Sequence, residues 1–266
     1  MTQISIVLPV ASQVQLTRRC LDSLLAGTSI ARELIVIDNH STDATPGVLN
    51  EYAVKFREQG WEFFCLKNAE NVGFGRACNQ GLAASHGDFV TVLRNDVWLM
   101  PGWDAVLLRR IQHLRVDMVG PHIDESPFDP VRIREKASHF VRKNHGKVSK
   151  DWVSTLMFFR REALQALGVE DGPFDERFSS AYEDTDLRYR MEKAGMTYRQ
   201  VADCYIWRFS GHRAGNREKT EVSSAYEEDL KLFIGKWGFD PLMGENTRKA
   251  RFHRRWKKFK KALGLF

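Results

Sequence analysis

Residues 4–39 read ISIVLPVASQVQLTRRCLDSLLAGTSIARELIVIDN, and the fold that we predict for the chain rests first on this stretch. It opens with an apolar, β-branched run at 4–10, which is typical of a strand covered on both faces. A segment with apolar residues at helical spacing follows and stops at Gly27, before a second apolar run at 33–39. Strand, helix and strand in this order indicate an α/β fold.

The same alternation continues beyond residue 39. Further strands are predicted at 61–68, 88–96 and 116–123, and helices at 41–56, 73–87 and 101–114. Such a repeat predicts a Rossmann-like, mainly parallel sheet with helices on both faces. The alternation stops after residue 123, where 124–150 is basic and irregular, and a strand and a helix follow at 152–168. We therefore expect a nucleotide-binding half at 1–123 and a second half at 124–245.

The composition indicates an ordinary globular protein, with 43% hydrophobic and 28% charged residues among 266. A run of eighteen or more apolar residues, as a membrane-spanning helix needs, does not occur in the sequence. The first residues lack the basic region and cleavage site of a secretory signal. The four cysteines show no C-x-x-C spacing, which favours reduced thiols. These features predict a cytoplasmic location.

The net charge of +6 is concentrated at the end of the chain. Residues 248–266 contain nine Lys or Arg and no Asp or Glu, and the rest of the chain is slightly acidic. Apolar residues recur there at helical spacing; they are Phe252, Trp256, Phe259, Leu263 and Phe266. A basic amphipathic helix of this kind is typical of attachment to an anionic membrane surface. We treat 246–266 as a separate basic tail, for which packing on the core is the alternative.

Three carboxylates stand at the start of a predicted helix, in the stretch FDERFSSAYEDTDLRYR at 174–190. Acidic residues in a first turn can simply oppose the helix dipole. Leu187, Met191 and Ala194, however, form the apolar stripe of this helix, and the spacing turns Glu183 and Asp184 toward the protein. Asp186 is expected to point away from the stripe. An inward carboxylate pair suits acid–base chemistry.

Polar residues also gather where three of the predicted strands end. They are Asp38 and Asn39, Asn68 to Asn71, and Asn95 and Asp96. Ligands of open α/β sheets bind beyond the carboxyl ends of the strands. Gly73 and Gly75 let the backbone approach a ligand, with Asn71 and Asn79 as polar contacts. The G-x-G-x-x-G fingerprint and a Walker lysine are missing from this sequence, which disfavours dinucleotide and P-loop sites.

Taken in order, these blocks resemble the family 2 glycosyltransferases with the GT-A fold, in particular the bacterial rhamnosyltransferase-like branch. The resemblance covers roughly residues 4–212, from ISIVLPV through LIVIDNHSTDAT, NAENVGFGRACNQGL and FVTVLRNDVWLMPGW to GPFDERFSSAYEDTDLRYRMEKAG. It implies that Pro9 and Val10 border a nucleotide pocket and that Asp38 contacts the base. It further implies that Asn71 and Gly73 line the ribose and diphosphate.

The resemblance also implies the catalytic residues. Asp184 would be the general base, and Glu183 would hold the acceptor or the base in place. Asp96 stands where the last Asp of the family's D-x-D motif binds a divalent cation, Mn²⁺ or Mg²⁺. The protein would then be an inverting enzyme that moves a sugar from a UDP or dTDP donor to a saccharide or lipid-linked acceptor in bacterial surface polysaccharide synthesis.

Two positions depart from the family pattern. Arg94 replaces the first acidic residue of the D-x-D motif, so that Arg94 and Asn95 are expected at the nucleotide. Arg208 stands where relatives have a metal-binding His, and His212 is the nearest alternative ligand. Either His212 binds the metal or Arg208 supplies a fixed charge in its place.

Other functions stay open at this point. A nucleotidyltransferase also places carboxylates and a nucleotide on an α/β sheet, but it usually has a Gly- and Lys-rich loop that residues 9–19 lack. A catalytically inactive sugar-nucleotide-binding or scaffold module is the alternative that Arg94 supports. The acidic cleft argues against nucleic acid as a partner.

Overall fold

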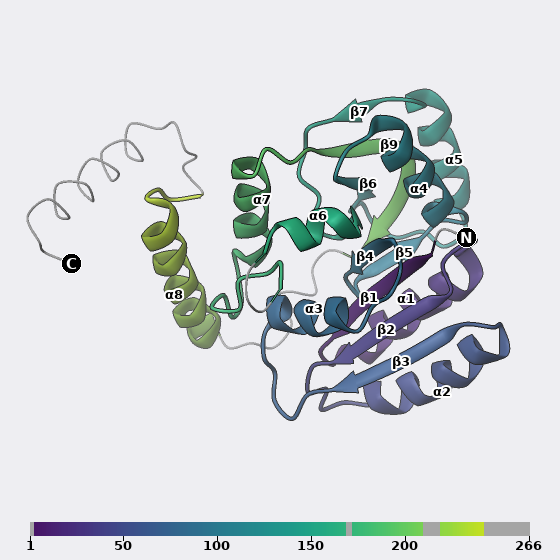
Figure 1. Cartoon of the computed structure of the whole chain (residues 1–266). Helices are drawn as coiled ribbons and strands as arrows, with labels where there is room; N and C mark the ends of the chain where they lie inside the picture. The colour runs from purple at the N-terminus through teal and green to yellow at the C-terminus, as the bar shows by residue number, and fades with distance from the viewer. Residues whose placement is uncertain (1–2, 169–171, 210–218, 242–266) are drawn as a thin grey trace, which may run out of the picture.

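The computed structural model describes residues 3–168, 172–209 and 219–241 (Figure 1). His212 and the predicted tail at 246–266 lie outside the described residues. The strands are β1 (Ile4–Val10), β2 (Glu33–Asp38), β3 (Glu62–Lys67), β4 (Phe89–Leu93), β5 (Val97–Leu99), β6 (Met118–Asp124), β7 (Val148–Ser149), β8 (Leu156–Arg160) and β9 (Tyr198–Arg208). The helices are α1 (Val14–Gly27), α2 (Thr45–Glu58), α3 (Phe74–Ala83), α4 (Trp103–Leu114), α5 (Ile133–Asn144), α6 (Arg161–Ala166), α7 (Glu183–Lys193) and α8 (Lys219–Trp237).

The strands of the described residues form one sheet in the order β3-β2-β1-β4-β8-β6-β9-β5, with β7 paired to β9. β1 lies parallel to both β2 and β4, and β2 lies parallel to β3. This half is the parallel sheet that the sequence predicts. Beyond β4 the pairing becomes mixed, because β8 lies antiparallel between β4 and β6, and β5 and β7 lie antiparallel to β9. Large α/β sheets commonly combine the two arrangements.

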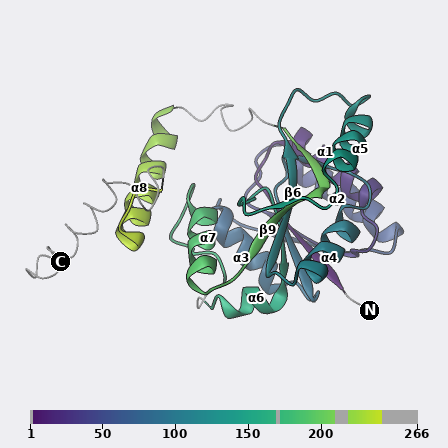
Figure 2. The same ribbon diagram turned by 90° about the horizontal axis from the view of Figure 1, so that it is seen from above.

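Helices cover both faces of the sheet, as predicted (Figure 2). On one face α1, α2 and α4 pack through residues such as Leu21, Phe56 and Leu107, all fully buried. On the other face α3, α6 and α7 pack through Cys78, Leu164 and Leu187. With both faces covered, β1 is buried along its whole length, which explains its unbroken apolar sequence. None of the described helices combines the length and apolarity that crossing a bilayer requires.

The prediction that residues 124–150 are irregular is wrong. They contain α5 and the short strand β7. The buried residues of α5 are Ile133 and Ala137, and charged residues occupy half of the remaining positions. Ile133, Ala137, Phe140 and Val141 recur at helical spacing, so a helical signal was present in the sequence, but the basic residues among them led it to be overlooked. These apolar residues pack against aromatic residues of β9, including Tyr205 and Trp207.

Helix α8 lies beside α7, away from the sheet, in both views of the molecule (Figures 1 and 2). Phe233 of α8 and Phe239 just after it are buried against Tyr182 and Tyr189. This aromatic cluster attaches α8 to α7 and to the loop before it. The second half of the chain therefore contributes two neighbouring helices at one edge of the site described next.

Candidate active site

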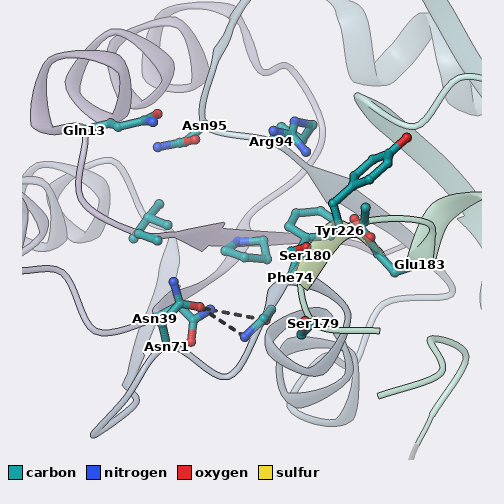
Figure 3. A pocket seen from close by; sticks show the side chains of 15 residues that line it. Gln13, Asn39, Asn71, Phe74, Arg94, Asn95, Ser179, Ser180, Glu183 and Tyr226 are labelled. Carbon is teal, nitrogen blue, oxygen red and sulfur yellow. Dashed lines mark hydrogen bonds between the residues drawn. The ribbon is translucent and has the colours of Figure 1, made fainter. Parts of the chain in front are cut away.

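A pocket of about 440 Å³ lies at the carboxyl ends of β1, β2 and β4 (Figure 3). Pro9 and Val10 at the end of β1 line it, together with Asn39 after β2 and Asn95 after β4. The three strands are parallel neighbours, so their ends meet at one edge of the sheet, where ligands of open α/β folds bind. The volume lies within the range of small-molecule sites, about 300–1,000 Å³.

The turn between β1 and α1 is fixed in an unusual conformation. Ser12 and Gln13 have φ angles of 56° and 61°, in the left-handed region that residues other than glycine rarely adopt. The Ser12 N–H donates to Oγ of Ser41 (2.8 Å), and the Thr42 N–H donates to Oγ of Ser12 (3.1 Å). These bonds tie the turn to the loop after β2. They hold Gln13 at the pocket, where its side chain forms part of the wall.

Asn39 organises the Gly-rich turn on the other side of the pocket. Its Nδ2 donates to Oδ1 of Asn71 (2.8 Å) and to the carbonyl oxygen of Gly73 (3.2 Å) (Figure 3). Its Oδ1 accepts from the N–H of Val72 and from Nδ2 of Asn68, both at 3.0 Å. Asn39 is buried, and these contacts satisfy both ends of its amide. Carbonyl and amide groups of the turn are thereby presented to the pocket at fixed positions.

Position 73 requires glycine for two reasons, its backbone conformation and its close contact with another loop. Its φ angle is 87°, and a Cβ at this position would lie 2.9 Å from the carbonyl oxygen of Ser179. Ser179 belongs to the loop before α7, more than a hundred residues later. Any side chain at Gly73 would therefore push this loop away from the Gly-rich turn. Ser179, Ser180 and Ala181 line the pocket opposite β1.

Asn79 supports this loop and does not line the pocket, contrary to the sequence prediction. Its Nδ2 donates to the carbonyl oxygen of Phe174 (2.8 Å), and its Oδ1 accepts from the N–H of Phe174 (3.0 Å). The side chain is buried, and its Nδ2 also donates to Oε1 of Glu176 (3.1 Å), so its amide is engaged within the protein and is not placed to contact a ligand. Asn79 links α3 to the start of the loop at 174–182.

Asp229 of α8 holds the other end of the same loop. Its carboxylate accepts from the backbone N–H groups of Ser179 (3.1 Å), Ser180 (2.7 Å) and Ala181 (2.9 Å). Asp229 is almost fully buried, with 3% of its surface exposed. One turn earlier on α8, Tyr226 lines the pocket, and its hydroxyl contacts that of Tyr182. Helix α8 thus contributes one residue to the wall and positions three others.

Asp186 was predicted to point away from the apolar stripe of α7, and the structure shows that this other face is buried as well. Its side chain is fully buried and accepts from Nε of Arg190 (2.8 Å), Nε1 of Trp237 (2.8 Å) and Nζ of Lys236 (2.7 Å). Lys236 also bonds to Asp175 (2.6 Å). Hydrogen bonds from Arg177 and Lys236 hold the pKa of Asp175 well below its usual range. Helix α8 buries this second face of α7, which the apolar stripe of α7 alone does not reveal.

The predicted carboxylate pair begins α7. Glu183 is buried and lines the pocket, close to Ser180 and Tyr226 (Figure 3). Asp184 is half-buried, and its Oδ1 accepts from the N–H (2.7 Å) and the hydroxyl (3.2 Å) of Thr185. It is not among the residues that line the pocket. Of the predicted stripe, Leu187 and Met191 are buried, whereas Ala194 is exposed.

Asp96 is engaged by two arginines. Nε of Arg94 lies 3.3 Å from its Oδ1, and Nε of Arg208 lies 3.1 Å from its Oδ2. Both carboxylate oxygens therefore face fixed positive charges, which repel a cation from the same atoms. The described part of the chain contains no group of three or more His, Cys, Asp or Glu that could hold a metal. These residues do not fit a divalent cation in their present arrangement.

The structure thus gathers most, but not all, of the predicted site. The predicted residues that line the pocket are Pro9, Val10, Asn71, Gly73, Arg94, Asn95 and Glu183. Asp38 is buried and accepts the N–H of Ser41 (2.9 Å), while its neighbour Asn39 lines the pocket. Asp96 and Asp184 lie next to lining residues, and the role of His212 stays a prediction because it falls outside the described part of the chain.

Sequence reasoning missed several wall residues, among them Gln13, Phe74, the three residues 179–181 and Tyr226. Gln13 and Phe74 follow predicted strands, so their position after a strand end was an available signal. Tyr226 and the loop at 179–181 carry no such signal. They reach the pocket through the docking of α8, which only the tertiary structure reveals.

Comparison with known proteins identifies relatives of this chain by sequence. The family model of glycosyl transferase family 2 matches residues 5–173. N-acetylglucosaminyl-diphospho-decaprenol L-rhamnosyltransferase of Mycobacterium tuberculosis (strain CDC 1551 / Oshkosh) is 25% identical, and the match covers 86% of this chain and 84% of that protein. EpsH of Bacillus subtilis (strain 168) is 30% identical over 40% of this chain, which spans 29% of its length. The chain spans 16% of another relative, glycosyltransferase GlyA of Streptococcus pneumoniae.

Solved structures share the fold. The mannosyltransferase PcManGT from Pyrobaculum calidifontis, in complex with GDP-Man and Mn²⁺, superposes with a TM-score of 0.62 at 15% identity, covering 100% of this chain and 81% of its own. S. aureus TarS 1-349 in complex with UDP-GlcNAc gives a TM-score of 0.61 at 14% identity, covering 95% and 78%. The arrangement is therefore the GT-A glycosyltransferase fold, as the sequence predicts.

Proposed function

The chain belongs to glycosyl transferase family 2, and we propose that it transfers a sugar from a nucleotide-diphosphate donor to a hydroxyl group of a saccharide or lipid-linked saccharide. The observation that carries this proposal is the pocket itself. It combines strand-end amides and a Gly-rich turn with a buried carboxylate, Glu183, on the opposite wall. A polar cleft with a carboxylate facing it suits a ligand that is part nucleotide and part sugar.

The donor would occupy the side formed by the strand ends. Pro9, Val10 and Asn39 border the space for the base, and Asn71 and Gly73 present backbone and amide groups for the ribose and diphosphate. Asp38 is retained as the proposed base contact from the resemblance, and the N–H of Ser41 engages one of its two carboxylate oxygens. UDP and dTDP are the proposed carriers of the sugar.

Transfer would occur against α7. The acceptor oxygen attacks the anomeric carbon from the face opposite the diphosphate, the bond from that carbon to the diphosphate oxygen breaks, and Asp184 takes the hydroxyl proton. Attack on this face inverts the anomeric configuration. Glu183, one residue earlier and facing the pocket, would hold the acceptor. Catalytic hydrogen bonds often form fully only when substrate is bound, so the contact of Asp184 with Thr185 is compatible with this role.

A divalent cation, Mn²⁺ or Mg²⁺, supplies charge neutralisation to the leaving diphosphate in enzymes that use one. The resemblance assigns Asp96 and His212 to such a cation in this chain. The two arginines on Asp96 argue against that part of the prediction, and no step of the proposed reaction depends on it.

Nucleotide binding gives the first test. UDP and dTDP should raise the melting temperature of the full chain, and GDP and ADP should raise it less. A ligand at 100 times its dissociation constant adds about 2.7 kcal/mol of stability, which corresponds to a shift of roughly 5–10 °C for a protein of this size. The measurement is a thermal-shift series with each nucleotide at several concentrations. If none of the four nucleotides shifts the melting temperature, the donor class is wrong.

The basic tail suggests where the enzyme works. We propose that residues 246–266 attach the protein to the inner face of a bacterial cytoplasmic membrane, where a lipid-linked acceptor would be found. The proposal rests on the nine basic residues and the apolar stripe of the sequence. Each basic residue near an anionic surface contributes about 1 kcal/mol, so a few suffice for reversible attachment.

Truncation tests this attachment. The full chain should co-sediment with vesicles that contain anionic lipid, and less so as salt is raised. A chain that ends at Asn246 should keep its nucleotide-induced thermal shift but lose co-sedimentation. Vesicles of neutral lipid are the control. If the full chain ignores anionic vesicles at low salt, the tail serves packing or a protein partner, and the lipid-linked acceptor loses its main support.

A further inference from the structure

We propose that Arg94 binds the diphosphate of the donor directly, and that Asp96 and Arg208 hold it in place, so that nucleotide binding needs no divalent cation. This inference rests on the proposed function and specifies how the charge of its leaving group is met. The three side chains form what we call the Arg94–Asp96–Arg208 group.

The backbone fixes the three members of the group relative to one another. Arg94 follows β4, and its N–H donates to the carbonyl oxygen of Thr155 (3.1 Å). Arg208 ends β9 and lies opposite Val97 in the antiparallel β5–β9 pair. The N–H of Phe209 donates to the carbonyl oxygen of Asp96 (2.8 Å), so the strand that carries Arg208 is bound to the residue it neutralises. These contacts fix the backbone of the three residues, and the two arginines then engage both carboxylate oxygens of Asp96.

Arg94 is the member that reaches the pocket. It lines the wall between Asn95 and Phe74, and its guanidinium lies 5.5 Å from the centre of the Phe74 ring. A guanidinium carries five N–H donors, and the contact with Asp96 uses one of them. The planar fork of donors matches the oxygens of a phosphate, which makes arginine well suited to this ligand.

The charge of the group matches what a cation would supply. A divalent cation on one aspartate leaves a net charge of +1, and two arginines on one aspartate leave the same net charge. The side chains of Arg94 and Arg208 are each 21% exposed and that of Asp96 is 10% exposed, so water screens the group only in part. Glu125 also pairs with Arg208 (3.0 Å), but its side chain is half exposed and its charge is screened more strongly.

A cation at Asp96 would meet a cost that this arrangement avoids. It would have to displace two guanidinium groups from the carboxylate oxygens or share those oxygens with them. Sharing places a divalent charge beside two fixed positive charges in a partly buried site, where repulsion is strong. Displacement takes the Asp96 acceptor away from Arg94 and leaves Arg208 with the half-exposed Glu125. The group therefore acts as a built-in replacement for the cation.

Calorimetric titration of UDP or dTDP into the full chain tests the inference without relying on activity. The affinity should be the same within error in EDTA and in millimolar Mn²⁺. Arg94→Met should weaken binding by roughly 10- to 100-fold in both conditions, the loss of a charge-assisted contact. Arg132→Met, at an exposed arginine just before α5, is the matched control and should leave the affinity unchanged.

Arg208→His separates charge replacement from a merely structural role. It removes one positive charge from Asp96 and places an imidazole beside it. Binding should fall in EDTA and recover on addition of Mn²⁺, which a structural defect would not do. If the unaltered chain binds nucleotide only with Mn²⁺, the inference is overturned while the proposed function stands. If the unaltered chain binds no nucleotide under either condition, both the proposed function and this inference are wrong.

Discussion

Asp184→Asn is expected to reduce sugar transfer by about 10²- to 10⁴-fold, the usual contribution of a positioned general base. The substitution keeps the shape of the side chain, and an amide oxygen can still accept the N–H of Thr185. It removes only the ability to take a proton. Nucleotide affinity should stay unchanged, because the base acts on the acceptor hydroxyl and not on the donor. Transfer of labelled sugar and calorimetric titration of the nucleotide measure the two effects on the same preparation.

Glu183→Gln is the matched variant on the neighbouring residue. Glu183 lines the pocket and is proposed to hold the acceptor, so its loss should raise the KM for acceptor more than it lowers kcat. The pair of variants assigns the base. If Asp184→Asn keeps more than about a tenth of the transfer rate while Glu183→Gln loses the 10²-fold or more expected of a base, the base is Glu183. The resemblance would then have placed the role one residue too late.

The parallel half of the sheet was predictable because the burial of each central strand shows directly in that strand's own sequence. Each of its central strands is buried on both faces, so the strand appears as an unbroken apolar run. β1 is found at 4–10 as predicted, and β2 ends within a residue of its predicted end. The second half lacks this signal. α5 does show helical spacing, at Ile133, Ala137, Phe140 and Val141, but only the first two are fully buried, and its five charged residues favoured the interpretation as a basic loop.

The residues of the candidate site also fall into two groups, those that the sequence could place and those that it could not. Pro9, Val10, Asn71 and Asn95 follow or end predicted strands, and the rule that ligands bind beyond strand ends is enough to place them. Asp186 was misplaced because the apolar stripe of α7 indicates one buried face, whereas α8 buries another. Two of the three partners of Asp186, Lys236 and Trp237, lie some fifty residues later in the chain. Contacts of this range have no counterpart in local periodicity.

Asp229 also contacts residues that lie about fifty positions away in the sequence. Among such residues, its substitution is expected to have the largest effect on the stability of the fold. Its carboxylate accepts three successive backbone N–H groups, those of residues 179–181, inside a closely packed contact between α8 and the loop before α7. Asp229→Ala leaves all three donors without this acceptor. Ser179 and Ser180 are exposed and Ala181 is half-buried, so water can replace part of these bonds. The loss of the charge-assisted hydrogen bonds should then cost about 1.5–3 kcal/mol in all, and the melting temperature should fall by roughly 3–12 °C.

The exposed neighbour Glu228 provides the control, because Glu228→Ala changes the charge of α8 by the same amount without touching the loop. Asp229→Asn should fall between the two, since an amide oxygen still accepts but its NH₂ group cannot. The loop at 179–181 is also a wall of the pocket and packs against Gly73. Asp229→Ala should therefore weaken nucleotide binding at temperatures where the protein remains folded. If Asp229→Ala and Glu228→Ala lower the melting temperature equally, the three bonds do not hold the wall, and the contact of α8 with the pocket depends on its aromatic residues alone.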